Sequence, residues 1–147
     1  MRTRRGFSLI EVLIAVFLVI TCMLIVIATM PLATASRNKA DRSTKAIGLA
    51  QKELEALRGA GYPNLTPTQM YSYGLIDNTT AVSSNTYTFT NADALAYDSP
   101  ANVLPNGTGT VTVEQLDFDL RRLTVAVTYR DLNTTKTVRL GTIVANL

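Results

Sequence analysis

Two residue types that often carry chemistry are scarce in this chain of 147 residues, which has no histidine and only one cysteine. Histidine is the commonest general base and the commonest zinc ligand, so an enzyme with this sequence would lack the side chain most often used for both tasks. Cys22 can form no intramolecular disulfide, and no thiol cluster is available for a metal. The composition therefore favours a non-enzymatic protein that needs no cofactor and no metal.

Charge is absent from one long stretch, Val12 to Ser36, and positions 12–30 within it are apolar except for Thr21 and Thr29. As an α-helix this stretch would extend about 37 Å, which is long enough to cross a bilayer. Three arginines lie before it and none lies within it. Because basic residues stay on the cytoplasmic side, we expect a single span with a cytoplasmic N-terminus and the chain after Ser36 outside.

The formal net charge of +3 comes from the N-terminus alone. Arg2, Arg4 and Arg5 all precede Gly6, so removal of the first six residues brings the side-chain charge from +3 to 0. A neutral body gives no support for nucleic-acid binding. The remaining basic residues of the C-terminal third would form either a local patch or, as we expect, scattered surface charge: Arg121, Arg122, Arg130, Lys136 and Arg139.

A second helical pattern follows the apolar run and predicts an amphipathic helix at positions 37–58. Its apolar residues recur at steps of three and four among charged ones, and the helix should end at a group of breakers, Gly59, Gly61 and Pro63. The expected core stripe consists of Ala40, Ile47, Ala50, Leu54 and Leu57.

The rest of the chain, 59–147, reads as a loop region followed by strands. Positions 64–106 are rich in Thr, Ser and Asn, with one short strand suggested at Tyr87 and Phe89. Three segments dense in Val and Thr then predict an antiparallel meander at 108–114, 123–130 and 135–144, with a reversal at 131–133. The predicted fold class is α+β, with the amphipathic helix packed on a small antiparallel sheet.

The most informative stretch is the junction between the basic leader and the apolar run. Gly6 ends the leader, Phe7 follows, and Glu11 is the single carboxylate at the start of the apolar helix. A carboxylate in a bilayer costs roughly 2.5 to 3.5 kcal/mol at the centre and less near the interface, so Glu11 requires a partner. Cleavage after Gly6 would create an amine on Phe7, and two offset helices would bring this amine beside the Glu11 of a neighbour.

This stretch, from Arg5-Gly6-Phe7 through Glu11 to Ala15, resembles the signal of type IV prepilins and type II secretion pseudopilins. The resemblance implies cleavage after Gly6 by a prepilin peptidase, N-methylation of Phe7 and a Glu11 that sets register in a filament. It divides the chain into a leader (1–6), a transmembrane and filament-core helix (7–36), an amphipathic helix (37–58) and a sheet domain (59–147).

The same resemblance predicts the partners and the location of the protein. Other pilins would bind through the N-terminal helix, and an inner-membrane assembly platform would handle the subunit before it reaches a periplasmic or surface filament. The C-terminal segment from Arg121 to Leu140 is similar to minor pilins and minor pseudopilins, which favours a minor subunit over a major one. These residues do not separate the two classes, so we expect a minor pilin of a type IV pilus, with a type II secretion minor pseudopilin as the alternative.

Two other interpretations remain open. Arg4-Arg5-Gly6-Phe7 also resembles part of a twin-arginine export signal, and Ala33-Thr34-Ala35 fits an ordinary signal-peptidase site, which would release a soluble binding domain after Ala35. Alternatively, the apolar helix is a plain membrane anchor with Glu11 at the interface.

Some pseudopilins bind calcium with loop carboxylates and carbonyls, so the aspartates of the C-terminal part are candidate calcium ligands. The candidates here are Asp93, Asp98, Asp117 and Asp119, and their spacing matches no EF-hand. We expect these aspartates to form a solvated polar edge.

Overall fold

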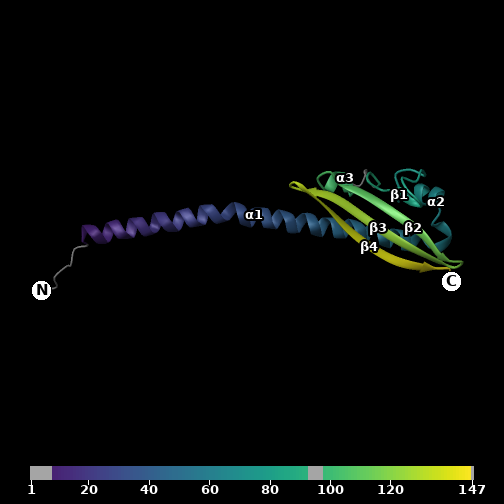
Figure 1. The fold of residues 1–147 in the computed structure, drawn as a ribbon, viewed down its shortest axis with the longest axis horizontal. Helices are drawn as coiled ribbons and strands as arrows, with labels where there is room; N and C mark the ends of the chain where they lie inside the picture. Colours follow the sequence, from purple (N-terminus) through teal and green to yellow (C-terminus); the bar gives the residue numbers. More distant parts are fainter. Residues whose placement is uncertain (1–7, 93–97, 147) are drawn as a thin grey trace. The chain divides into compact units, whose positions relative to one another are not determined.

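The computed structural model describes residues 8–92 and 98–146, and the chain divides into two compact units, Met1–Lys39 and Ala40–Leu147. The elements follow the order α1, η1, α2, β1, α3, β2, β3 and β4 (Figure 1). The described part of the first unit is helical from Leu9 onward, and the second unit contains the rest of α1 and the whole sheet.

Helix α1 spans Leu9–Ala60 and contains Pro31. Proline has no backbone N–H, so one intrahelical bond is missing there, yet the helix continues on both sides. The helix ends where its glycines predicted, because Gly61 has a left-handed φ of 78° and its N–H donates to the Arg58 carbonyl at 3.2 Å.

The sheet is a four-stranded antiparallel meander in the order β1-β2-β3-β4 (Figure 1). The strands are β1 (Thr86–Thr88), β2 (Thr108–Asp117), β3 (Leu120–Asp131) and β4 (Thr134–Ala145). The meander and the reversal at 131–133 are thus confirmed, and β2 continues past the expected end through a register shift between Gln115 and Asp117.

The core of the second unit lies between the sheet and the C-terminal part of α1. Strand β3 supplies it with Leu123, Val125, Val127 and Tyr129, which are at most 2% exposed, as their strict alternation predicted. The packing of a long N-terminal helix on an antiparallel sheet confirms the α+β class.

The predicted core stripe of the amphipathic helix is only partly right. Ala50 and Leu57 are fully buried and Leu54 is partly buried, but Ile47 is 39% exposed and Ala40 is exposed. The buried face instead consists of Ala46, Leu49, Ala50, Glu53 and Leu57. Both stripes satisfy the helical period, and the sheet covers the face that includes a glutamate.

The segment expected to be mostly loop contains short helices and much of the core. It forms η1 (Tyr62–Asn64), α2 (Pro67–Ser72), the predicted short strand β1 and α3 (Pro100–Val103). Each of the three short helices has a proline at its first or second position, which is a favourable place for this residue. The segment buries Leu65, Met70, Leu75, Ile76, Tyr87, Phe89 and Leu104.

Arg121 joins the first residues after α1 to the sheet. Its Nη1 donates to the carbonyls of Tyr62 and Leu65 at 3.1 and 3.2 Å, and its guanidinium lies 4.3 Å from the centre of the Tyr62 ring. The Tyr62 hydroxyl in turn donates to the Phe118 carbonyl at 2.8 Å. These contacts fix the β2–β3 turn against the chain segment that follows α1.

Candidate processing and assembly site

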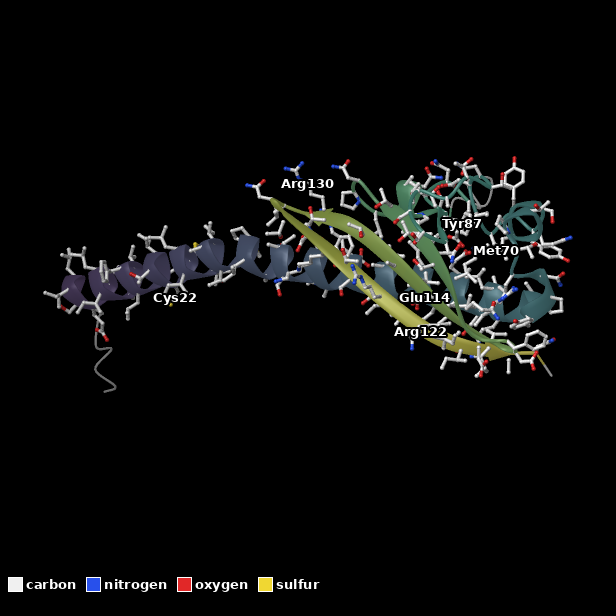
Figure 2. All side chains as sticks on the ribbon, turned by 45° about the vertical axis from the view of Figure 1, so that its right-hand side comes forward. Cys22, Met70, Tyr87, Glu114, Arg122 and Arg130 are labelled. Atoms are coloured by element: carbon white, nitrogen blue, oxygen red, sulfur yellow. The ribbon has the colours of Figure 1, made fainter. Side chains whose placement is uncertain are left out.

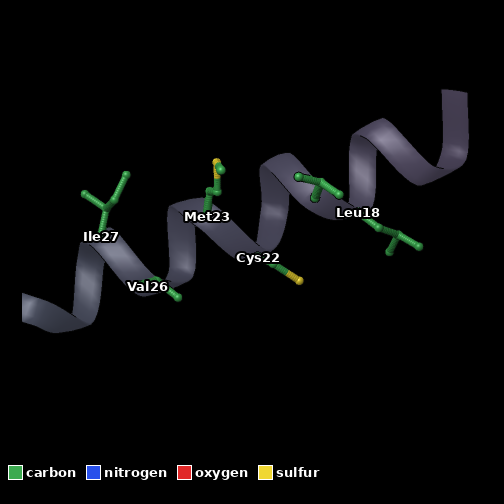
Figure 3. A pocket seen from close by; sticks show the side chains of 6 residues that line it. Leu18, Cys22, Met23, Val26 and Ile27 are labelled. Carbon is green, nitrogen blue, oxygen red and sulfur yellow. The ribbon is translucent and has the colours of Figure 1, made fainter. Parts of the chain in front are cut away.

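The apolar part of α1 presents bare hydrophobic side chains on every side. Its most apolar 18-residue window has a mean hydropathy of 3.1, and none of that window is buried in the protein. In the close-up, Met23 and Ile27 point to one side and Cys22 to another (Figure 3). The shallow hollow that these side chains line together with Leu18, Val19 and Val26 has no polar group and suits another helix or lipid chains.

The three threonine hydroxyls inside this apolar run are satisfied within the helix. The Thr21 hydroxyl donates to the Phe17 carbonyl at 2.8 Å, that of Thr29 to Val26 at 3.0 Å and that of Thr34 to Met30 at 3.0 Å. A buried hydroxyl without a partner is costly in hydrocarbon. The three threonines therefore fit an apolar environment without help from a neighbour.

Glu11 lies in the first turn of α1, where its backbone N–H donates to the Ser8 carbonyl at 2.9 Å. A carboxylate near a helix N-terminus is stabilised by the helix dipole. Among described residues 8–36 it is the only charged side chain, and it is exposed. The structure thus presents one carboxylate at the beginning of the otherwise uncharged first part of α1, available to a partner.

The family comparison bears on this same end of the chain. Residues 1–29 match the model of the prokaryotic N-terminal methylation motif, which covers the leader, Glu11 and most of the apolar run. The motif and the long apolar helix together fit a type IV pilin-like protein. No curated protein and no solved structure matches the chain.

For a type IV pilin-like protein, the motif implies processing by a prepilin peptidase and assembly with other pilins, and it fits anchoring in a membrane before assembly. Gly6 and Phe7, the predicted cleavage site, lie within the matched residues but outside the described ones. Of the three predicted site residues, the structure therefore places Glu11 alone.

The candidate calcium ligands do not come together. In the described part of the chain, no group of three or more acidic, histidine or cysteine side chains forms a metal site. Asp98 pairs with Lys52 at 3.3 Å, Asp117 accepts from the Phe118 N–H, and Asp119 accepts from Asn146. Asp93 lies outside the described residues.

The basic residues of the sheet separate toward its two ends. Arg122 pairs with Glu114 at 3.4 Å near the β2–β3 turn, whereas Arg130 lies beside the β3–β4 turn, and Figure 2 shows them far apart along β3. Arg122 and Arg130 therefore belong to no common patch, whereas Lys136, which binds Asp131, lies at the same turn as Arg130.

One cluster of charged side chains, at the β3–β4 turn, was not predicted from the sequence. Asp131 is 7% exposed and accepts from two cations, Arg42 at 3.2 Å and Lys136 at 3.0 Å. Arg42 is 89 positions away along the chain, so no local pattern reveals the contact.

Proposed function

We propose that this protein is a filament subunit of a type IV pilus, made as a precursor, cleaved between Gly6 and Phe7, and assembled through α1. The observation that carries the proposal is the methylation motif at residues 1–29, which overlaps the start of α1, where every large apolar side chain from Leu9 to Leu32 is exposed. Such a surface requires lipid before assembly and neighbouring helices afterwards.

Glu11 has the role of a register residue in this proposal. Cleavage converts the Phe7 amide into a free amine, which N-methylation leaves basic. Inside a bundle of apolar helices, the only charged group that the described part of residues 8–36 offers this amine is the Glu11 carboxylate. The offset that pairs Phe7 of one subunit with Glu11 of the next would be favoured over all others.

The protein acts as a structural subunit and not as an enzyme, since its motif is that of a family whose members are generally structural. We assign it to the minor subunits because its segment from Arg121 to Leu140 is similar to minor pilins and minor pseudopilins, and of these two we propose a minor pilin. The second candidate is a minor pseudopilin of type II secretion, since that family carries the same kind of signal.

Before assembly, the subunit would lie in the bacterial inner membrane with its N-terminus in the cytoplasm and residues after Ser36 in the periplasm. The three leader arginines support this topology. The assembly platform of the inner membrane would then transfer α1 from the bilayer to a periplasmic or surface filament.

The mass and first residue of the mature protein test the proposed processing. We expect a chain that begins with methylated Phe7 when the precursor is made together with a prepilin peptidase. A chain that begins at Ser36 would instead establish ordinary export after Ala35. Continuity of α1 through Ala33, Thr34 and Ala35 supports the first result.

Replacement of Glu11 tests the proposed assembly contact. Glu11→Ala should leave processing intact and greatly reduce incorporation into filaments, because the Phe7 amine loses its counter-charge. Glu55→Ala, an exposed glutamate later in the same helix, is the matched control and should be incorporated normally. Normal incorporation of Glu11→Ala would refute the register role.

A further inference from the structure

The turn between β3 and β4 holds a large apolar residue in an unfavourable position. Leu132 is 80% exposed and has a φ of 55°. Glycine and asparagine adopt this left-handed region readily, whereas a bulky side chain there is strained. Neither burial nor local geometry explains a leucine at this position, and strained residues concentrate at functional sites.

Basic side chains surround this turn. Arg42 and Lys136 both bind the Asp131 carboxylate, and the Arg130 guanidinium donates to the Leu132 carbonyl at 3.2 Å. Two cations thus share the Asp131 carboxylate, and a third, Arg130, lies at the same turn on a neutral carbonyl. Figure 2 shows Arg130 at the end of the sheet.

The opposite turn of the same sheet offers a comparison. Phe118, between β2 and β3, is 86% exposed, but its two neighbours are Asp117 and Asp119. Each turn therefore carries an exposed apolar residue, with basic neighbours at one end and acidic neighbours at the other.

The Arg42–Asp131 ion pair shows which turn lies beside the start of the second unit. Arg42 is six positions after Ser36, the last residue of the uncharged run, whereas the Phe118 turn is bonded to Tyr62, beyond the end of α1. The basic turn is thus at the end of the unit where the chain arrives from its apolar segment.

We propose that the β3–β4 turn docks on the surface of the membrane in which the subunit is anchored. Leu132 enters the lipid interface, and Arg42, Arg130 and Lys136 meet the headgroups of anionic phospholipids. An apolar anchor with adjacent cations is the combination that binds anionic bilayers. This inference rests on the membrane-anchored stage of the proposed function, and it gives the turn a role before assembly.

A single tryptophan is a direct reporter, because the chain contains none. We would place Leu132→Trp and, as a matched control, Phe118→Trp in the full chain, and reconstitute each in nanodiscs that contain phosphatidylglycerol. Emission from Trp at position 132 should shift to shorter wavelength and be quenched by brominated lipids, whereas Trp at position 118 should stay as in water. Equal quenching at both positions, or none at 132, would overturn the proposal.

The electrostatic contribution has its own test. Adding Arg130→Gln to Leu132→Trp should reduce the quenching in phosphatidylglycerol and leave it unchanged in phosphatidylcholine. Circular dichroism checks the fold, and Asn133→Trp replaces the reporter if position 132 does not tolerate tryptophan. An equal response to Arg130→Gln in both lipids would overturn the role of charge.

Chemical labelling of Cys22 distinguishes a failure of the docking proposal from a failure of membrane anchoring. As the single cysteine, in the apolar run, it should resist a water-soluble maleimide in the nanodisc. A protected Cys22 with an unquenched Trp at 132 overturns the docking alone. A labelled Cys22 overturns the anchored state and the docking with it.

Discussion

At the scale of single residues, the glycines show how local space decides what a position tolerates. Gly109 lies in β2, where an added Cβ would approach the ring of Phe89 to 2.6 Å, and Phe89 is itself 2% exposed. Gly48 lies on the exposed side of α1, where an added Cβ would meet nothing within 4 Å. The first glycine is required by packing, and the second is not.

We therefore expect opposite effects from two identical substitutions. Gly109→Ala should lower the free energy of unfolding by about 1 to 3 kcal/mol, because the buried ring has to move. Gly48→Ala should raise it by about 0.5 to 1 kcal/mol, since alanine loses less backbone entropy in a helix. Denaturant unfolding of both variants, followed by circular dichroism, measures the difference, and effects of equal sign would contradict the packing described for β2.

At the scale of elements, adjacent arginines on β3 have different functions because successive side chains of a strand point to opposite faces. Arg121 faces the chain after α1 and is half-buried against Tyr62, whereas Arg122 is on the other face in an exposed pair with Glu114. The first connects two elements, and the second contributes surface charge.

Replacing each of the two arginines by lysine should distinguish the structural role of Arg121 from the surface role of Arg122. Arg121→Lys should destabilise the second unit by about 1 to 3 kcal/mol, because an ammonium cannot bond two carbonyls and stack on Tyr62 in the same geometry. Arg122→Lys should change stability by no more than about 0.5 kcal/mol, as expected for an exposed ion pair. Thermal and denaturant unfolding compare the two, and similar losses would show that the contacts of Arg121 contribute little.

At the scale of the whole molecule, the two units depend on different surroundings. All hydrophobic core residues belong to the second unit and begin at Ala46, whereas described residues 8–41 are exposed. The first unit thus needs lipid or other subunits to cover it, and the second has a core of its own.

A fragment that begins at Ala40 should therefore fold without detergent. We expect circular dichroism to show the helix and sheet content of the second unit, together with a cooperative thermal transition, because the fragment retains every core residue. The full chain in detergent is the control. An unfolded or aggregated fragment would mean that the second unit depends on the apolar segment.

Most of the architecture follows from local patterns in the sequence. A continuous apolar run, a glycine that ends α1 and strict alternation along β3 each depend on period and turn chemistry, which neighbouring residues specify. The processing signal formed by the leader and Glu11 could likewise be predicted, because it depends on fixed spacing within one short segment. Gly6 and Phe7 remain predictions as a processing site, as does Glu11 as an assembly contact.

The tertiary structure decided which of two possible apolar stripes of α1 is buried in the core, and which charged residues far apart in the sequence form ion pairs. Ile47 is exposed, although it belongs to the predicted stripe, and Glu53 is buried, because the sheet covers one particular side of α1. The helical period alone does not specify that side. The ion pair of Arg42 with Asp131 and the strained exposure of Leu132 likewise depend on segments that meet only after the sheet has packed on α1. The sequence by itself determines periodicity, because neighbouring residues specify it. Which face of α1 packs against the sheet depends on all the tertiary contacts together.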